Sequence, residues 1–494
     1  MRKKITAEEF FKILVDGEPA KNLEVTGEVA FQKNIADASL NINKAIEISN
    51  CSFEKIEFSY PEKSPEFPSI TFHHCHFNSG ISISKVIFQD LKFIACHFGF
   101  DISFSQIKLL NNNSLEIEVS SNLSAVGIAN TEDLDIIITA TNNMVEIGGV
   151  YFHSFKNVNL TIQNIRVIQF SAIGKTFLNK LSIIESNIDR IDSSVAFYDL
   201  EISSSPGTKT TINTFEFPIN LTADIDISNC EITDLKINSL NQKHQNFKLQ
   251  NVIIKETFEL TNSTLNRGFF NIVQFKNTAK FNDSLLTDIN FNQVDFKNTK
   301  VDFENTFLGN CTFTNIRWPK NHELYSQQDV NIPRDKLLTQ QEVYRQLKLN
   351  MKNSGNSIDS LAFYQKEMET YWMYIRKNKS INWQNRFLIS LNKHVNNFGQ
   401  DWVRPTILLF IIHFFLFLFM INTGYTNIKF VLPLDAEFGA TITGLKEYLR
   451  LLFPLHSTDN KLNSDILFID TLIRINSGFF IYFIFGAGRK YTYK

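Results

Sequence analysis

The sequence is poor in the residues that break or cross-link a chain, with 19 Gly, 11 Pro and 5 Cys among 494 residues. An odd number of cysteines argues against a disulfide framework and predicts reduced, buried thiols. The net charge of −2 supplies no overall field that would attract nucleic acid or an anionic surface. We therefore expect no nucleic-acid partner, and any electrostatic partner must be recognised locally.

Export and enzyme signals are also missing. The N-terminal segment MRKKITAEEFFKILVDGEP has neither the apolar run nor the small-residue cleavage site of a signal peptide, so we expect the chain body to stay in the cytosol. A P-loop, a GxSxG elbow and a CxxC pair are absent. Four acids, Asp133, Asp135, Asp189 and Asp192, are scattered rather than clustered, so a β-helix polysaccharide lyase or hydrolase is only a third alternative. We predict no catalytic residue and no cofactor.

Phenylalanine is abundant instead, with 47 residues, which favours β structure with an aromatic interior. All the cysteines occupy one slot of an eight-residue pattern: apolar, any, apolar, any, any, small, any, apolar. The copies IEISNCSF, ITFHHCHF, LKFIACHF, IDISNCEI and TFLGNCTF hold Cys51, Cys75, Cys96, Cys230 and Cys311. Alternation on each side of the slot indicates two short strands with one buried face, joined at a corner.

The pattern recurs with a regular step. Copies begin near residues 46, 70, 91, 115, 134, 160, 181, 200, 225 and 247, a step of about 22 residues that is typical of solenoids. One step predicts one coil, so residues 40 to 318 allow about a dozen coils spaced at roughly 4.8 Å. Asn50, Asn229 and Asn310 fit the corners, because asparagine favours turns.

Near the end of this region apolar residues recur every five positions. They are Phe281, Leu286, Phe291, Phe296 and Val301, followed in a shifted frame by Phe303, Leu308, Phe313 and Trp318. Residues 279–318 resemble the pentapeptide-repeat β-helices, whereas residues 25–250 have longer coils that depart from the five-residue step. The resemblance implies a mainly β fold, a right-handed β-solenoid.

The stretch ITFHHCHF raises the question of a metal site. In the repeat frame Cys75 points inward, while His74 and His76 flank a corner. His74, His76 and His97 belong to coils about 4.8 Å apart, so three imidazoles could share one zinc ion. The interpretation we favour is that exposed solenoid positions tolerate histidine and that no metal binds.

The sequence predicts helices at both ends of the solenoid. Thr6 and Glu9 form a capping box ahead of FFKILVDG, so a short amphipathic helix in residues 1–24 should close the first coil of a solenoid that covers residues 25–318. After a linker, residues 319–338, we expect a cytosolic helical hairpin and neck, residues 339–400. Thr339 is predicted to cap its first helix, Gly355 to stop it, and Ser357 to start the second.

The order of these parts resembles that of bacterial pentapeptide-repeat-containing membrane proteins. The resemblance is carried by a Trp-Pro pair, the hairpin VYRQLKLNMKNSGNSIDSLAFYQKEME, and the segment WQNRFLISLNKHVNNFGQDWVRP that leads into an apolar stretch. It covers residues 316–494 in arrangement and 316–410 in motif. It implies an α-helical hairpin and two transmembrane helices after the solenoid, but no activity and no catalytic residue.

Two apolar segments in residues 401–494 predict membrane spans at about residues 403–421 and 466–487, each long enough to cross roughly 30 Å of hydrocarbon. The expected interface anchors are Trp402, Arg404, Arg489 and Lys490. Between Tyr371 and Arg404 the sequence has six Lys or Arg and one acid, whereas the loop 422–465 has four basic and five acidic residues. This asymmetry predicts that the solenoid and the C-terminus lie in the cytoplasm, at a bacterial inner membrane.

Four polar residues inside the spans are candidates for membrane function: His413, Asp470, Arg474 and Asn476. Asp470 and Arg474 could pair on one helix face, or Arg474 could extend alone toward the interface. His413 is expected at a helix contact rather than in a proton relay. Between the spans, Leu445 to His456 predicts an interfacial helix, in a layout that also suits a two-helix channel subunit without a potassium filter.

The sequence therefore predicts a membrane-anchored cytosolic β-solenoid that serves as a non-enzymatic scaffold or sensor. Its expected partners are the lipid bilayer and a protein on the solenoid face. The alternative is a membrane effector whose spans assemble into a non-selective pore or leak on a cytosolic signal, with phage defence as one setting. Homo-oligomers would bury the polar residues of the second span.

Overall fold

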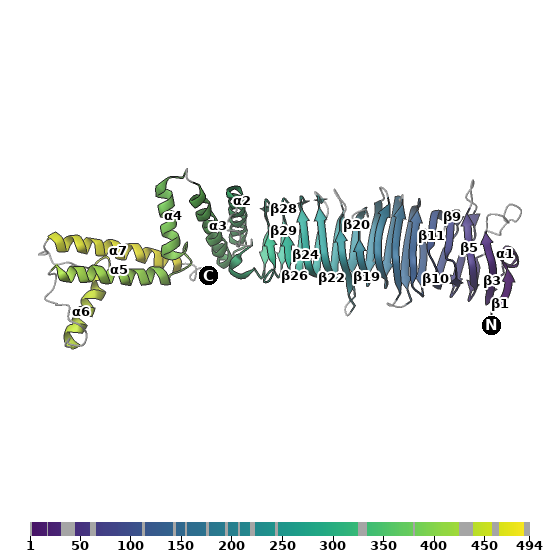
Figure 1. The fold of residues 1–494 in the computed structure, drawn as a ribbon, viewed down its shortest axis with the longest axis horizontal. Coiled ribbons are helices and arrows are strands. Elements are labelled where there is room, and N and C mark those ends of the chain that lie inside the picture. The colour runs from purple at the N-terminus through teal and green to yellow at the C-terminus, as the bar shows by residue number, and fades with distance from the viewer. Residues whose placement is uncertain are drawn as a thin grey trace. The chain divides into compact units, whose positions relative to one another are not determined.

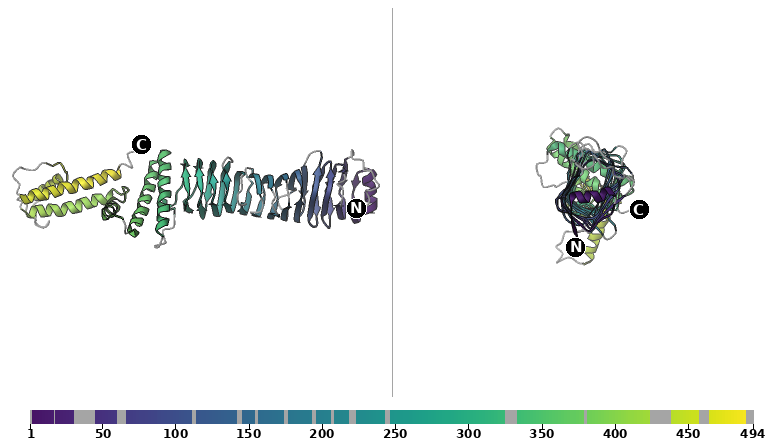
Figure 2. Two further views of the ribbon diagram at one scale, coloured as in Figure 1. Left: turned by 90° about the horizontal axis from the view of Figure 1, so that it is seen from above. Right: turned by 90° about the vertical axis from the view of Figure 1, so that its right-hand side faces the viewer.

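The computed structural model describes residues 2–16, 18–30, 45–59, 66–110, 114–141, 145–153, 156–173, 177–192, 196–205, 208–217, 223–242, 246–324, 333–378, 381–423, 438–456 and 464–488. The chain divides into two units, Met1–Ser326 and Gln327–Lys494. The fold is mainly β, with 47% strand, and the first unit is a parallel β-solenoid of about 12 turns. Figures 1 and 2 show its strands stacked in successive coils, so the predicted solenoid is confirmed.

The strands of the first unit form a 28-stranded sheet and a 4-stranded sheet. Those of the N-terminal half are β1 Lys3–Thr6, β2 Ala20–Lys21, β3 Leu23–Ala30, β4 Ile46–Ser49, β5 Ser52–Ser59, β6 Glu66–Phe67, β7 Ile70–His73, β8 His76–Phe77, β9 Ile81–Phe88, β10 Leu91–Phe98, β11 Ile102–Leu109, β12 Ser114–Val119, β13 Leu123–Ala129, β14 Glu132–Ala140, β15 Glu146–His153 and β16 Lys156–Gln163. Those that follow are β17 Arg166–Ile173, β18 Phe177–Ile184, β19 Asn187–Ile191, β20 Ala196–Ser203, β21 Thr210–Glu216, β22 Asp224–Asn238, β23 Asn241–Gln242, β24 Phe247–Thr261, β25 Thr264–Leu265, β26 Gly268–Phe275, β27 Thr278–Lys280, β28 Leu285–Thr287, β29 Ile289–Asn292, β30 Lys300–Asp302, β31 Phe307–Gly309 and β32 Thr312–Thr314.

Equivalent residues of successive coils pair in register. Ile46 is the partner of Ile70, and Ile70 is the partner of Leu91, as the repeat predicts. One predicted start is wrong, because Ile136 rather than Leu134 pairs with Leu115. Both Leu134 and Ile136 are buried, so alternation alone does not distinguish the two frames.

Stacked aromatic rings fill the interior of the coils. Ring centroids are 5.3 Å apart between Phe53 and Phe77, and 5.1 Å apart between Phe77 and Phe98. All five cysteines are free and buried, as predicted. Burial raises the pKa of the Cys230 and Cys311 thiols to about 12, so these thiols stay protonated and unreactive near neutral pH.

Corners of the coils are built from residues with a left-handed backbone. Asn50, Asn229 and Asn310, the predicted corner residues, have φ angles of 54°, 52° and 53°. Asparagine tolerates this conformation better than other residues with a side chain. Neighbouring corners also bond to each other, since Asn251 Nδ2 donates to Asn229 Oδ1 at 2.9 Å.

The helix α1 (Ala7–Asp16) covers the first coil, as predicted. The Thr6 backbone N–H donates to Glu9 Oε2 at 2.8 Å, and the Glu9 N–H donates to Thr6 Oγ1 at 3.3 Å, which is a reciprocal capping box. Phe10 is fully buried, and its ring lies 5.0 Å from that of Phe53. The helix therefore closes the apolar interior of the solenoid.

The second unit is helical over its described residues. Its helices are α2 Arg334–Asn353, α3 Ser357–Lys377, α4 Trp383–Asn396, α5 Val403–Asn422, α6 Phe438–Leu451 and α7 Ser464–Gly488. The predicted hairpin is present as α2 and α3, joined at Gly355, whose φ is 79°. Lys348 Nζ and Glu367 Oε2 are 2.6 Å apart across the hairpin.

The predicted start of the first hairpin helix is wrong. The helix α2 begins at Arg334, directly after Pro333, and Thr339 lies inside it. The Thr339 hydroxyl donates to the Lys336 carbonyl at 2.9 Å, within the helix, and does not accept from an N–H group at the helix start. Proline suits a helix start because its φ is already close to helical, and this favours the earlier beginning.

Two helices of this unit, α5 and α7, are long and apolar enough to cross a membrane, with mean hydropathies of 2.2 and 1.5 in their apolar windows. Their bounds match the two predicted spans to within a few residues. The helix predicted for Leu445 to His456 instead spans Phe438–Leu451. It ends before Pro454, since proline disfavours a helical conformation in the residue before it.

Candidate functional site

Of the polar residues predicted inside the spans, His413 of α5 and Asp470 of α7 are buried, and Arg474 and Asn476 of α7 are half-buried. Buried side chains of α5 recur every three or four residues and therefore occupy one face: Pro405, Leu409, His413, Phe417 and Met420. The opposite faces are apolar and exposed, as at Phe415 (65%) and Phe468 (66%). The polar groups are thus enclosed between helices with apolar outer faces, as is expected of a pair in hydrocarbon.

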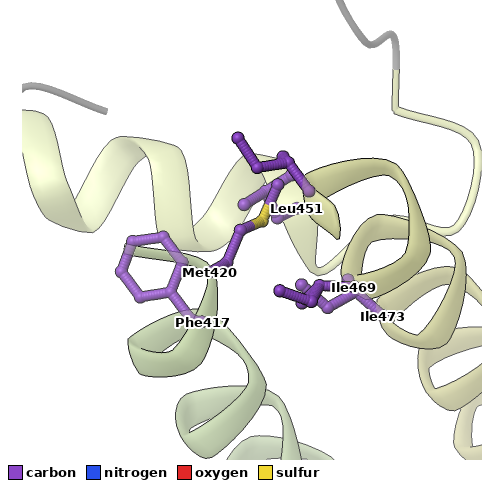
Figure 3. Packing of buried hydrophobic residues seen from close by; sticks show 6 residues of the cluster. Phe417, Met420, Leu451, Ile469 and Ile473 are labelled. Atoms are coloured by element: carbon purple, nitrogen blue, oxygen red, sulfur yellow. The ribbon is translucent and has the colours of Figure 1, made fainter. Parts of the chain in front are cut away.

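An apolar cluster joins these helices to the end of α6. Its buried members are Phe417, Met420, Leu451, Ile466, Ile469 and Ile473. Figure 3 shows Met420 and Leu451 directed toward one another, with Ile469 and Ile473 beside them on the neighbouring helix. The end of α6 is therefore packed against both α5 and α7.

A triad of charged and polar side chains, Asp470, Arg474 and His456, lies beside this cluster. Asp470 is 2% exposed and accepts from Arg474 Nε through Oδ2 at 2.8 Å. Its other oxygen, Oδ1, lies 2.5 Å from His456 Nε2. Arg474 also donates to the His456 carbonyl at 2.8 Å. Of the two arrangements that the sequence left open for Arg474, the pairing with Asp470 is the one present. Through His456 it holds the segment after α6 against α7.

The hydrogen-bond partners of the triad indicate which atoms of His456 and Asp470 carry protons. His456 Nδ1 is 2.6 Å from the Phe453 carbonyl, which can only accept, so Nδ1 carries a proton. An ionised Asp470 then requires a second proton on His456 Nε2. Without that proton on the imidazole, Asp470 itself would have to be protonated to keep the 2.5 Å contact. The site therefore holds a proton between a histidine and a carboxylate in a buried place.

His413 fixes α6 to the middle of α5. The side chain is fully buried, and its Nε2 donates to the Tyr448 carbonyl at 3.1 Å. In return, the Tyr448 hydroxyl donates to the Phe410 carbonyl at 3.0 Å. His413 is thus at a helix contact, as the sequence predicted.

Three buried polar atoms in this region have no hydrogen-bond partner among the described residues. They are His413 Nδ1, Asn476 Nδ2 and Ser477 Oγ. A buried polar group without a partner costs free energy, and the cost is largest in a membrane. These atoms are therefore where water or another chain would bind most favourably.

Charged residues of α6 lie close to the contact with His413. Glu447 pairs with Arg450 at 2.9 Å, and both are within one helical turn of Tyr448. Lys446 is exposed on the same turn. Because Tyr448 binds the middle of α5, these charges are placed beside the central part of a helix whose outer face is apolar.

The histidine candidates of the solenoid do not converge. His76 and His97 pair in register with ring centroids 5.1 Å apart, whereas His74 is exposed at a corner with a φ of 48°. Burial, with Arg2 and His97, lowers the pKa of His76. Within the described residues no group of three or more His, Cys, Asp or Glu could hold a metal ion.

The scattered acids of the solenoid belong to ladders between coils. Asp135 accepts from Asn159 at 2.7 Å, and Asp189 lies 3.2 Å from Arg166. Asp192 accepts from Gln169 Nε2 of the preceding coil at 3.2 Å. These contacts join neighbouring strands and do not bring the acids into one cleft.

The predicted interface anchors are partly described. Trp402 is 48% exposed at the start of α5, and Arg404 pairs with Asp401 at 2.8 Å. Arg489 and Lys490 lie outside the described residues. His456 and Tyr448 are the contributors that sequence reasoning missed, because both act from the segment between the spans. The motif Pro454-Leu-His456, a histidine just past a helix-ending proline, is the signal that could have indicated His456.

A comparison with family models, curated proteins and solved structures finds no match to the chain.

Proposed function

We propose that this chain is a non-enzymatic, membrane-anchored scaffold or sensor with its solenoid in the cytosol. The observation that carries the proposal is the pair α5 and α7, whose polar residues His413 and Asp470 are buried and whose outer faces are apolar. The five-residue repeats support a relation to bacterial pentapeptide-repeat-containing membrane proteins. The excess of Lys and Arg before α5 supports an inner-membrane location with both ends in the cytoplasm.

The anchoring is tested by alkaline carbonate extraction of bacterial membranes. The full chain should remain in the membrane pellet, whereas a chain truncated after Gln400 should be released. Release of the full chain by carbonate would contradict a membrane-spanning anchor. Inverted vesicles expose the cytoplasmic face of the membrane. Trypsin added to them should therefore cut the linker between the solenoid and the helical hairpin.

The C-terminal coils of the solenoid provide a candidate surface for a protein partner. Phe269 and Ile272 are 51% and 41% exposed on one strand, β26. Ile272 has a φ of 56°, at a corner that the neighbouring coils build from Asn251 and Gln293. A β-branched residue is strained in this conformation, so its presence favours a contact function over stability.

Photo-crosslinking tests this surface. A benzoylphenylalanine in place of Phe269 should give a protein adduct in native membranes. The same probe in place of Lys248, the register partner of Phe269 in the preceding coil, is the matched control. Equal labelling from both positions, or from neither, would contradict a partner site at β26.

A second candidate function is a membrane effector that forms a leak on assembly. It is favoured by the charges Lys446, Glu447 and Arg450 near mid-span, and by the unpaired polar atoms of Asn476 and Ser477. Charges at this depth require water or protein around them, which a lined pore would supply. Membrane potential in bacteria that express the full chain, Arg474→Leu or the truncation after Gln400 distinguishes the two functions. Depolarisation by the intact chain alone supports the effector, and a steady potential supports the scaffold.

A further inference from the structure

The helix α4 has an apolar face that is only half covered. Phe387, Leu391 and Val395 are four residues apart and therefore lie on one side of the helix. At the C-terminal end this face is covered, since Val395 is buried with Leu409 of α5 and Phe480 of α7. The same face thus contacts the ends of both spans.

Beyond this contact the apolar face continues and is exposed among the described residues. Trp383, Phe387 and Leu388 are 70%, 57% and 60% exposed. Trp383 lies one turn before Phe387 on the same side of the helix. Since Val395 and Phe387 share a face, the exposed part is turned toward the side on which α5 and α7 lie.

The polar side of α4 carries positive charge only. Lys393 Nζ lies 3.8 Å from the ring centroid of Trp372, and the Arg376 guanidinium lies 4.7 Å from it on α3. Arg386 donates to the Asn378 carbonyl. None of these contacts is with a carboxylate, and residues 371–400 include no Asp or Glu. The acid that acts on Lys393 is Glu369 of α3.

The direction of α4 completes the geometry. Figures 1 and 2 show that α4 runs across the axes of α5 and α7, at the end where α5 begins. If α5 and α7 cross a bilayer, a helix in this direction lies along the bilayer surface. Its apolar face is then turned to the acyl chains and its cations remain at the level of the headgroups.

We propose that α4 is an interfacial helix that binds the surface of a bilayer rich in anionic phospholipids. The proposal rests on the membrane anchoring proposed above. The apolar side chains fit the boundary between headgroups and acyl chains. Arg376 and Arg386 fit lipid phosphates and acidic headgroups, because residues 371–400 contain no carboxylate that would compete for them.

Site-directed spin labelling of the full chain in vesicles tests the proposal. The five native cysteines are at most 2% exposed, so an introduced surface cysteine takes the label selectively. Phe387→Cys reports the apolar face, and Asn385→Cys, exposed on the other side of α4, is the matched control. Phe415→Cys, 65% exposed on α5, reports whether the span is inserted.

In vesicles of phosphatidylcholine with phosphatidylglycerol, the ratio of oxygen to nickel-chelate accessibility should be severalfold higher at 387 than at 385. Arg386→Gln should lower the ratio of membrane-inserted label to water-exposed label at position 387 by about fivefold. This is the effect expected from removing one cation near an anionic surface. Replacing phosphatidylglycerol with phosphatidylcholine should also shift the label toward water.

The three labels separate the possible failures. A label at 415 that stays in water overturns the membrane anchoring itself. If the label at position 415 is inserted while the label at position 387 stays in water, only the interfacial helix is overturned. If position 387 is protected in native membranes but not in vesicles, a protein rather than lipid covers this face. Equal immersion with and without phosphatidylglycerol overturns the preference for anionic lipid.

Discussion

At the scale of single residues, Ile272 has a strained left-handed backbone that lowers the stability of the solenoid. Replacing it with Asn gives this corner the residue of the preceding coil, Asn251, and removes a β-branched residue from a left-handed backbone conformation. We expect Ile272→Asn to stabilise the solenoid by about 1–2 kcal/mol, measured by chemical denaturation. Val273→Asn, at a buried position beside it, is the contrasting variant and should destabilise. An unchanged midpoint for Ile272→Asn would show that the corner is not strained.

The triad is the second feature that depends on individual residues. Asp470→Asn leaves Arg474 and His456 beside each other without a carboxylate, so we expect a loss of about 3–5 kcal/mol. Removing both charges, in Asp470→Leu with Arg474→Leu, should restore most of the stability. Thermal unfolding of the full chain in nanodiscs measures both, with Thr471→Ala on the exposed side of α7 as the control. A thermal midpoint for Asp470→Asn equal to that of the native chain would contradict a structural triad.

At the scale of elements, the cap α1 depends on two reciprocal hydrogen bonds between Thr6 and Glu9. Thr6→Ala removes the side-chain acceptor and should destabilise α1 by about 1 kcal/mol. Hydrogen exchange should therefore quicken in α1 and in the first coil, since Phe10 covers Phe53 there. Lys12→Ala, at an exposed position on α1 itself, is the control. Exchange that is unchanged in α1 would contradict the role of the capping box.

Elements that obey a strong period could be predicted from the sequence, and those held by contacts distant in sequence could not. The coils follow from alternation and a regular step, and α5 and α7 follow from apolar length. The predicted repeat start at Leu134 was wrong because the apolar alternation is equally good two residues later, at Ile136. His456 was missed because its partner Asp470 lies on another helix, and the pairing depends on how the chain returns after α6.

The α4 segment illustrates the same limit. Its residues were predicted as part of a neck, and the separate helix across the ends of the spans follows only from the burial of Val395 against Leu409 and Phe480. Amphipathic patterning indicates which face is apolar. What that face contacts is a property of the fold, and here half of it is mostly exposed in the part of the chain that the structure describes.

At the scale of the whole molecule, each solenoid coil pairs mainly with the coils before and after it, so stability should propagate by neighbour contacts. Phe170 is fully buried in the central coils, where its ring lies 5.0 Å from that of Phe152. Replacing it with Ala should cost about 3–5 kcal/mol. A loss of this size at the centre should uncouple the coils on its two sides.

The buried thiols report this uncoupling directly. Cys51, Cys75 and Cys96 lie before the substitution, and Cys230 and Cys311 lie after it. In Phe170→Ala, pulsed alkylation with mass spectrometry should therefore show two separate denaturant midpoints, one for each group of thiols. Ile168→Ser, 41% exposed on the same strand β17, should keep one common midpoint. If all the thiols of Phe170→Ala are exposed together, the solenoid unfolds as one cooperative block and neighbour coupling exceeds the cost of the cavity.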